Sequence, residues 1–168
     1  MLAYIRLILK QMALLTALSP LFVASCAYHV GGYRSGWFFN ADDRIKIVRT
    51  AERYLGVRYQ RGGASPDGFD CSGYVMYVYM KNGVLLPRSV RAQYGVGRKI
   101  RPDEMKSGDL VFYTTSREKY SHVGIYIGDH RFIHAPRSGK QVSYADMDRP
   151  YWKKRFAGSV TFMRNNNL

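Results

Sequence analysis

Two segments in the first half of the chain place apolar residues at helical spacing. The first follows Asn40, whose side chain can cap a helix, and stops at Gly56, a residue type that favours helix C-termini. Its apolar side chains share one helical face: Ala41, Ile45, Val48 and Leu55. This spacing predicts a helix between Asn40 and Gly56 that packs on a core.

The second helical segment is predicted to begin at Cys71, after a glycine-rich loop (residues 62–68), and to end at Gly83. The residues at helical spacing are Val75, Val78, Tyr79 and Asn82. β-branched and aromatic residues also suit a strand, but the glycine-rich entry and the Asn-Gly exit favour a helix. Cys71 is therefore expected in the first helical turn.

The remaining pattern is mainly that of strands. A short third helix is predicted from a cap at Ser89 through Gln93 and Tyr94. Beyond it, alternating apolar positions predict strands over residues 110–113, 122–127, 131–135 and 159–163, with 128–130 as a hairpin loop and 151–156 before the last strand. Helices that precede strands indicate an α+β fold in which N-terminal helices pack on an antiparallel sheet.

The two strands around residue 128 each carry a histidine. On the first, Val123, Ile125 and Ile127 alternate towards the core, so His122 is expected on the other face, which can be open. On the second, His134 shares a face with Phe132. An odd-numbered loop would place His122 and His134 directly opposite, whereas a two-residue turn would break this parity unless a bulge restored it. His134 could then hydrogen-bond one ring nitrogen of His122 and leave the other facing Cys71.

The first residues have the pattern of an exported lipoprotein. Arg6 and Lys10 precede an apolar stretch, and small residues lie immediately before Cys26. Residues 1–25 are therefore predicted to be a lipoprotein signal peptide, with a lipid on Cys26 and a tether over 26–40. A plain secretory signal or an N-terminal anchor helix remains an alternative. Ala27 favours attachment at the periplasmic face of the outer membrane, by resemblance to bacterial sorting rules.

The chain is strongly basic, with 26 Lys and Arg against 12 Asp and Glu and a formal net charge of +14. The basic residues are scattered, which favours a polyanionic neighbourhood such as nucleic acid, an anionic membrane or an anionic cell wall. The aromatic residues are not interleaved with them in a nucleic-acid-reading motif, so no nucleic-acid partner is expected. We expect a monomer.

Cys71 is the main indication of catalysis. Only two cysteines are present, so a lipid on Cys26 would leave Cys71 unpaired in an oxidising compartment. A helix N-terminus and a neighbouring histidine can both lower a thiol pKa and so favour the nucleophilic thiolate. A buried structural cysteine and a zinc site built from Cys and His are the alternatives. Because C-x-x-C and H-E-x-x-H spacings are lacking, we expect no metal and no cofactor.

Six further motifs occur in order along the chain: Tyr59 with Gly62-Gly63, Phe69-Asp70-Cys71-Ser72-Gly73-Tyr74-Val75, Leu86-Pro87-Arg88-Ser89 with Gln93, Gly108-Asp109-Leu110-Val111-Phe112, His122-Val123-Gly124-Ile125-Tyr126, and Phe132-Ile133-His134-Ala135. Together they resemble the NlpC family of cell-wall cysteine peptidases. Residues 150–154 (Pro-Tyr-Trp-Lys-Lys) resemble the enterobacterial lipoprotein branch. The resemblance implies a papain-like peptidase domain over 41–168 that hydrolyses peptidoglycan stem peptides or their crosslinks.

By this resemblance, Cys71 is the nucleophile, His122 the general base and His134 the residue that orients it. The family tyrosine matches Tyr59, which implies a role in stabilising the oxyanion, and Asp70 and Ser72 match positions that contact the substrate amine. Arg88 matches a further position of the substrate site. Gln60-Arg61 departs from the family pattern, where an aromatic residue often precedes the two glycines. A catalytically inactive, basic envelope-binding module is the alternative function.

Overall fold

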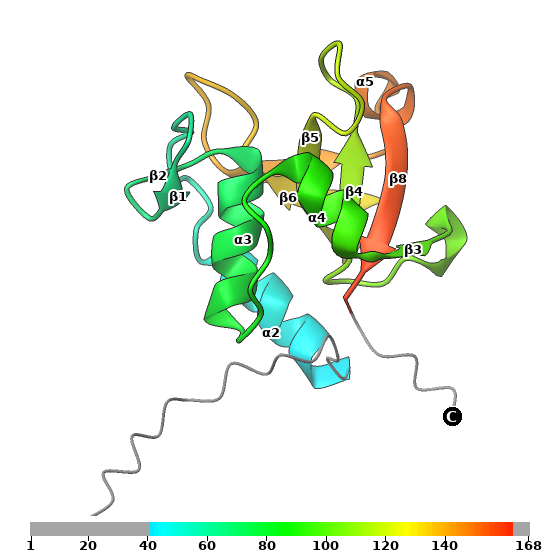
Figure 1. Cartoon of the computed structure of the whole chain (residues 1–168), viewed down its shortest axis with the longest axis horizontal. Helices are drawn as coiled ribbons and strands as arrows, with labels where there is room; N and C mark the ends of the chain where they lie inside the picture. The colour runs from blue at the N-terminus through cyan, green and yellow to red at the C-terminus, as the bar shows by residue number, and fades with distance from the viewer. Residues whose placement is uncertain (1–40, 163–168) are drawn as a thin grey trace, which may run out of the picture. The chain divides into compact units, whose positions relative to one another are not determined.

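The computed structural model describes residues 41–162 (Figure 1). The predicted leader (1–25), the tether (26–40) with Cys26, the cap Asn40 and the strand residue Met163 lie outside the described residues. No helix within 41–162 is long and apolar enough to cross a membrane.

An antiparallel sheet of six strands forms the centre of the domain, in the order β3-β8-β4-β5-β6-β7. Its strands are β3 (Arg98–Ile100), β4 (Leu110–Tyr113), β5 (His122–Gly128), β6 (Arg131–His134), β7 (Ser143–Asp146) and β8 (Phe156–Thr161). The four predicted strands are all confirmed, although β8 begins and ends earlier than expected, whereas β3 and β7 were not predicted. A small hairpin of β1 (Ala64–Ser65) and β2 (Gly68–Phe69) occupies the predicted loop.

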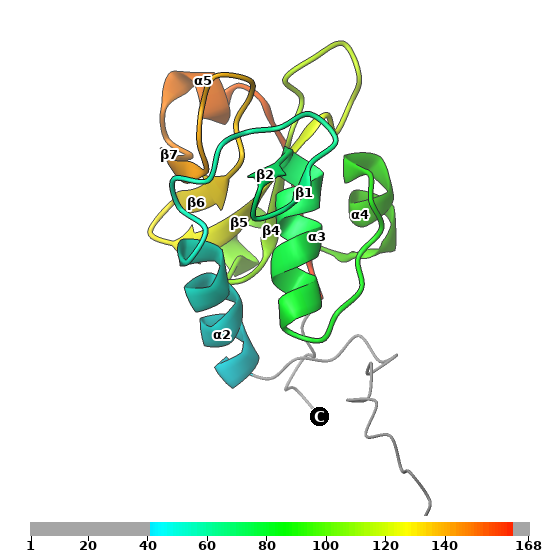
Figure 2. The same cartoon turned by 90° about the vertical axis from the view of Figure 1, so that its left-hand side faces the viewer.

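The helices α2 (Ala41–Glu52), α3 (Cys71–Lys81) and α4 (Val90–Val96) precede most of the strands, so the α+β class is confirmed. Figures 1 and 2 show α2 and α3 on one face of the sheet. Two short helices come later, η1 (Pro102–Glu104) and α5 (Pro150–Lys153). The third predicted helix is confirmed as α4, where the Ser89 hydroxyl accepts a hydrogen bond from the Ala92 amide at 3.2 Å.

The predicted apolar face of the first helix packs on the core only in part: Leu55 contacts the core, whereas Ile45 does not. α2 ends at Glu52, and the side chain of Ile45 is 53% exposed, whereas Ile47 and Ala51 are fully buried. The reason lies in Arg44, which is polar yet faces inward and donates to the buried carboxylate of Asp109 at 2.8 Å. This ion pair fixes the rotation of the helix, and apolar spacing alone does not reveal it.

The β5–β6 hairpin combines a two-residue turn with a bulge. Gly128 pairs with Arg131, and Asp129 and His130 form the turn with φ values of 49° and 54°. The register then shifts between Tyr126 and Gly128. The bulge therefore restores the alternation that a two-residue turn would otherwise break.

The restored register places the two strand histidines on one face but not directly opposite. Ile125 pairs with Ile133, so continuing the register by one residue puts Gly124 opposite His134. His122 lies two residues beyond Gly124 and is a diagonal neighbour of His134. Direct opposition, which was predicted only for an odd-numbered loop, does not occur, while the shared face is confirmed.

Each face of the sheet has its own core. The face covered by α2 and α3 buries a large cluster that includes Ile47, Val75, Phe112 and Ile125. On the opposite face, α5 and the chain around it cover a smaller cluster of Val111, Tyr113, Tyr126 and Phe132, with Trp152 and Phe156 packed against them. Both strand histidines belong to this second face because β5 alternates.

Candidate active site

Cys71 is the first residue of α3, as predicted. Asp70 caps the helix with an extended backbone (φ −90°, ψ 176°), and its Oδ1 accepts a hydrogen bond from the Gly73 amide at 2.7 Å. Only glycine fits at position 73, because a Cβ there would lie 2.0 Å from the Gly63 carbonyl oxygen. The glycine-rich loop and the first turn of α3 are thus in direct contact.

Asp70 accepts hydrogen bonds from four residues in all. Besides Gly73, they are the Gly62 amide at 3.0 Å, the Ser72 hydroxyl at 3.3 Å, and Arg88, whose two terminal nitrogens donate at 2.9 and 2.6 Å. Burial alone would raise the pKa of Asp70, but the bonds from Arg88, Gly73 and Gly62 outweigh it and hold the pKa below its usual value. Asp70 is therefore a carboxylate whose acceptor capacity is already used.

Ser72 and Arg88 complete this cluster. Ser72 is buried, and its hydroxyl accepts from Arg88 at 2.9 Å while it donates to Asp70. Arg88 is the exposed member, with 41% of its side chain accessible. The structure thus brings together three of the predicted substrate-binding residues, with Arg88 outermost.

Gln93 ties α4 to this cluster. Its side-chain amide is buried and donates to the carbonyl oxygens of Ser72 at 3.0 Å and Pro87 at 2.8 Å. The sequence placed Gln93 in a motif without assigning it a role. A buried amide that bridges the first turn of α3 and the segment before Arg88 fixes both backbones.

The two strand histidines form a hydrogen-bonded pair. His122 Nε2 lies 2.7 Å from His134 Nδ1, and the rings are perpendicular with centroids 5.0 Å apart. If His122 is to accept a proton on Nδ1, its Nε2 must carry the hydrogen and donate to His134. His134 then carries its own hydrogen on Nε2. The predicted hydrogen bond between the histidines is confirmed, and it leaves Nδ1 of His122 available.

The expectation that His122 lies on an open face is wrong. His122 is 5% exposed and His134 is 3% exposed. The cause is Trp152 of α5. Its ring stacks on that of His122, with the centroids 5.5 Å apart, and meets that of His134 edge-on, with the centroids 5.1 Å apart. No periodic signal in the sequence identifies Trp152, because it lies in a short helix that alternation and helical spacing both miss.

Cys71 lies beside the start of β5, and its surroundings contradict the expected low pKa. Burial, followed by the charge of Asp70, raises the pKa of the Cys71 thiol to about 11. The backbone amides of Val123, Ser72 and Cys71 itself hydrogen-bond the sulfur and act in the opposite direction. Burial also lowers the pKa of His122 to about 4. The helix N-terminus is present, but desolvation outweighs it, and both groups are uncharged near neutral pH.

This uncharged state has a direct test. Because the pKa of Cys71 is raised, thiolate should form only as the pH rises towards about 11. The ultraviolet thiolate absorbance of the wild type, minus that of Cys71→Ala, should stay constant between pH 5 and 9. Any change should be much smaller than the absorbance of one thiolate per protein. A full thiolate signal across that range would indicate a preformed thiolate–imidazolium pair instead.

Tyr59 is held next to the first turn of α3. Its backbone forms an isolated parallel β-bridge with Phe69, and its amide donates to the Lys140 carbonyl oxygen at 2.8 Å. Burial, together with the negative charges of Cys71 and Asp70, raises the pKa of its hydroxyl. The hydroxyl therefore stays protonated near neutral pH and remains a hydrogen-bond donor.

The described residues contain no group of three or more His, Cys, Asp or Glu side chains placed to hold a metal ion.

The comparison with known families decides the identity of the domain. Residues 56–161 match the model of the NlpC/P60 family. The chain belongs to the NlpC/P60 family. Its fold is the papain-like arrangement of helices and antiparallel sheet found in this family, and the structure of an NlpC/P60 family protein from Bacillus cereus superposes with a TM-score of 0.69 at 29% identity, covering 72% of this chain and 40% of that one.

Curated relatives of this NlpC/P60 chain carry names that refer to γ-glutamyl and murein bonds. The chain is 46% identical over 122 residues to the gamma-DL-glutamyl hydrolase of Bacillus subtilis, covering 70% of this chain and 29% of that protein. It is 39% identical over 121 residues to the murein DD-endopeptidase MepS/murein LD-carboxypeptidase of Escherichia coli, covering 70% and 62%. The match thus spans less than two thirds of either relative.

Proposed function

We propose that this protein is a peptidoglycan peptidase with Cys71 as its nucleophile, His122 as its general base and His134 as the residue that orients the base. One observation carries the proposal. The thiol of Cys71, in the first turn of α3, lies against the backbone of Val123, the residue after a histidine that is hydrogen-bonded to a second histidine. The names of the murein-cleaving relatives support the substrate class.

The proposed reaction is acyl transfer through a thioester. As the sulfur attacks the scissile carbonyl carbon, the thiol proton moves to Nδ1 of His122, so no free thiolate is required beforehand. The Cys71 amide and the Tyr59 hydroxyl donate to the oxyanion. The imidazolium of His122 then protonates the leaving amine as the C–N bond breaks. Water, deprotonated by His122, hydrolyses the thioester and releases the acid and the thiol.

The Asp70–Arg88 cluster is proposed to contact the substrate beside the scissile bond. Because Asp70 already accepts from four residues, a substrate amine can reach it only by displacing a donor. Arg88 is the exposed donor, and the loop amides are not free to leave without opening the first turn of α3. An amine on the substrate would thus exchange with Arg88, and Arg88 could then pair with a substrate carboxylate.

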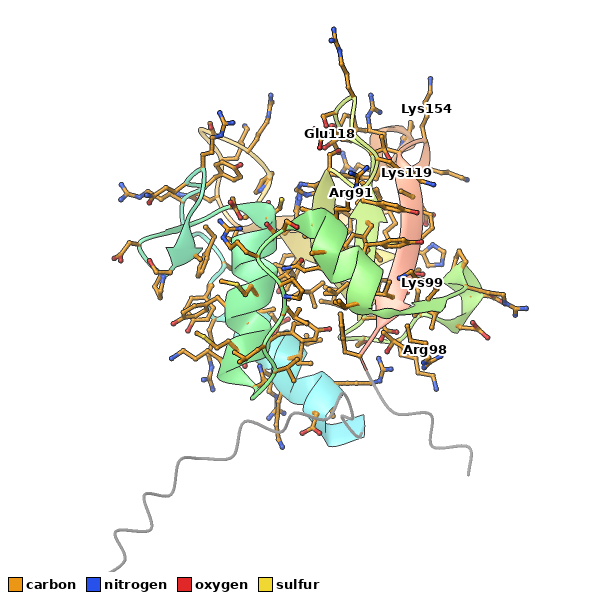
Figure 3. The ribbon with its side chains drawn as sticks, in the orientation of Figure 1. Arg91, Arg98, Lys99, Glu118, Lys119 and Lys154 are labelled. Carbon is orange, nitrogen blue, oxygen red and sulfur yellow. The ribbon has the colours of Figure 1, made fainter. Side chains whose placement is uncertain are left out.

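The face of the domain drawn in Figure 3 suits an anionic polymer. Figure 3 shows basic side chains on α4, on β3, in the loop before β5 and after α5: Arg91, Arg98, Lys99, Lys119 and Lys154, with Glu118 among them. Peptidoglycan stem peptides carry free carboxylates, so this charge favours association with the wall. From the N-terminal sequence pattern, we also propose a lipid on Cys26 and attachment at the periplasmic face of the outer membrane. We further propose that the protein is a monomer.

Two soluble substrates test the proposal and identify the bond. A D,D-crosslinked muropeptide dimer and an uncrosslinked stem peptide with a γ-D-glutamyl–diaminopimelate bond are incubated separately with the protein. We expect chromatography and mass spectrometry to show cleavage of at least one of them at a peptide bond. If neither is cleaved while the protein binds sacculi, the inactive envelope-binding module is the better account.

A further inference from the structure

Trp152 has a fixed place against both histidines. Its ring is nearly parallel to that of His122, at an interplanar angle of 28°, and nearly perpendicular to that of His134, at 84°. It packs against both imidazoles and so contributes to their burial. One side chain therefore contacts both rings of the hydrogen-bonded pair.

Residues of the smaller core also contact Trp152. The centroid of its indole lies 4.7 Å from that of the Tyr113 ring and 5.1 Å from that of the Phe132 ring. Its amide donates to the Arg149 carbonyl oxygen at 2.9 Å within a turn that Pro150 begins. With the exposed Tyr151, five aromatic or imidazole rings thus contact the indole, and a ring held in this way leaves its neighbours little rotational freedom.

The histidine pair requires such support because it is neutral. Among residues 41–162 no carboxylate acts on the pKa of either imidazole, so a water molecule could compete for either nitrogen of the hydrogen bond between them. The titratable groups next to the pair are Cys71, whose sulfur accepts from the Val123 amide, and Tyr113, which pairs with His122 across β4 and β5; burial raises the pKa of both. Arg155, on the α5 side, is turned towards Tyr151.

We propose that Trp152 is a positioning residue: its indole holds the His122 ring with Nδ1 towards Cys71 and excludes water from the His122–His134 hydrogen bond. The proposal rests on the function proposed above. It assigns a task to α5, which would otherwise only close a small core.

The kinetic test compares Trp152→Ala with Trp152→Phe and with Phe156→Ala. Phe156 belongs to the same aromatic cluster and contacts Tyr113 at 5.9 Å, but it makes no ring contact with either histidine. Trp152→Ala should lower kcat by about 100-fold with little change in KM, because a misplaced base loses the reactive geometry. Trp152→Phe should recover most of the loss. Phe156→Ala should lower thermal stability without this loss of kcat.

The pH profile separates positioning from a structural role. Removing the indole hydrates His122, so its pKa should rise from about 4 towards the usual value, and the acid limb of kcat/KM should move to higher pH. Phe156→Ala should leave the acid limb in place. Equal losses and equal pH profiles for Trp152→Ala and Phe156→Ala would overturn the proposal.

Tryptophan emission tests the contact without relying on activity. The chain has two tryptophans, so a Trp37→Phe protein leaves Trp152 as its only indole. Its emission should fall as the pH is lowered through the titration of the histidine pair, because an imidazolium quenches an adjacent indole. Adding both His122→Gln and His134→Gln should remove that step, because both rings contact Trp152. An emission unchanged by pH would overturn the contact, even if the substrate were never cleaved.

Discussion

Replacing Cys71 with Ala is expected to lower hydrolysis of a susceptible muropeptide by about 10⁴-fold or more, since no other thiol among residues 41–162 can form the acyl intermediate. The described residues contain a single cysteine, and none of the hydroxyl groups around it is paired with a histidine. Initial rates by chromatography of the products give the comparison directly.

A matched control separates lost chemistry from lost structure. Cys71→Ser keeps a similar volume at the first turn of α3 and should be nearly as inactive as Cys71→Ala, because a serine hydroxyl is a far weaker nucleophile without a strong base. Both variants should unfold within about 1 kcal/mol of the wild type, since Cys71 is only partly buried. An alanine variant with more than a tenth of wild-type activity would exclude Cys71 as the nucleophile.

Replacing His122 with Ala is expected to lower kcat by about 10³-fold, because the thiol would lose the group that accepts its proton. The raised pKa of Cys71 makes this loss severe, as the thiol cannot ionise unaided near neutral pH. The measurement is kcat and KM on the same muropeptide.

His134 provides the graded comparison. Since Nδ1 of His134 is expected to accept the hydrogen from His122, His134→Asn can keep an acceptor while His134→Ala cannot. The expected order of kcat is wild type, His134→Asn, His134→Ala and then His122→Ala. If His134→Ala were slower than His122→Ala, the roles assigned to the two histidines would have to be exchanged.

Much of the fold can be predicted from the spacing of residues along the chain. The strand that carries His122 alternates cleanly, and the helix that begins at Cys71 is bounded by glycines, so both were predicted within one or two residues. Asp70 caps this helix, a role that was not predicted although Asp is a favoured residue type there. The shared face of His122 and His134 was predictable only as a condition, because it depended on a bulge that sequence does not reveal.

The remaining features depend on contacts between distant segments. The rotation of α2 is fixed by the ion pair between Arg44 and Asp109, which are 65 residues apart. The burial of the histidine pair depends on Trp152, which belongs to a four-residue helix. Desolvation of Cys71 then reverses the pKa shift expected from a helix N-terminus. None of these effects has a periodic signature.

The most direct test of the central claim is mass spectrometry of the muropeptides released from purified sacculi by the wild type and by Cys71→Ala, side by side. The account predicts that the wild type releases fragments with a new amine and a new carboxylate at one kind of peptide bond, and that Cys71→Ala releases none above background. Equal release by the two proteins, or products cut only within the glycan strand, would contradict it.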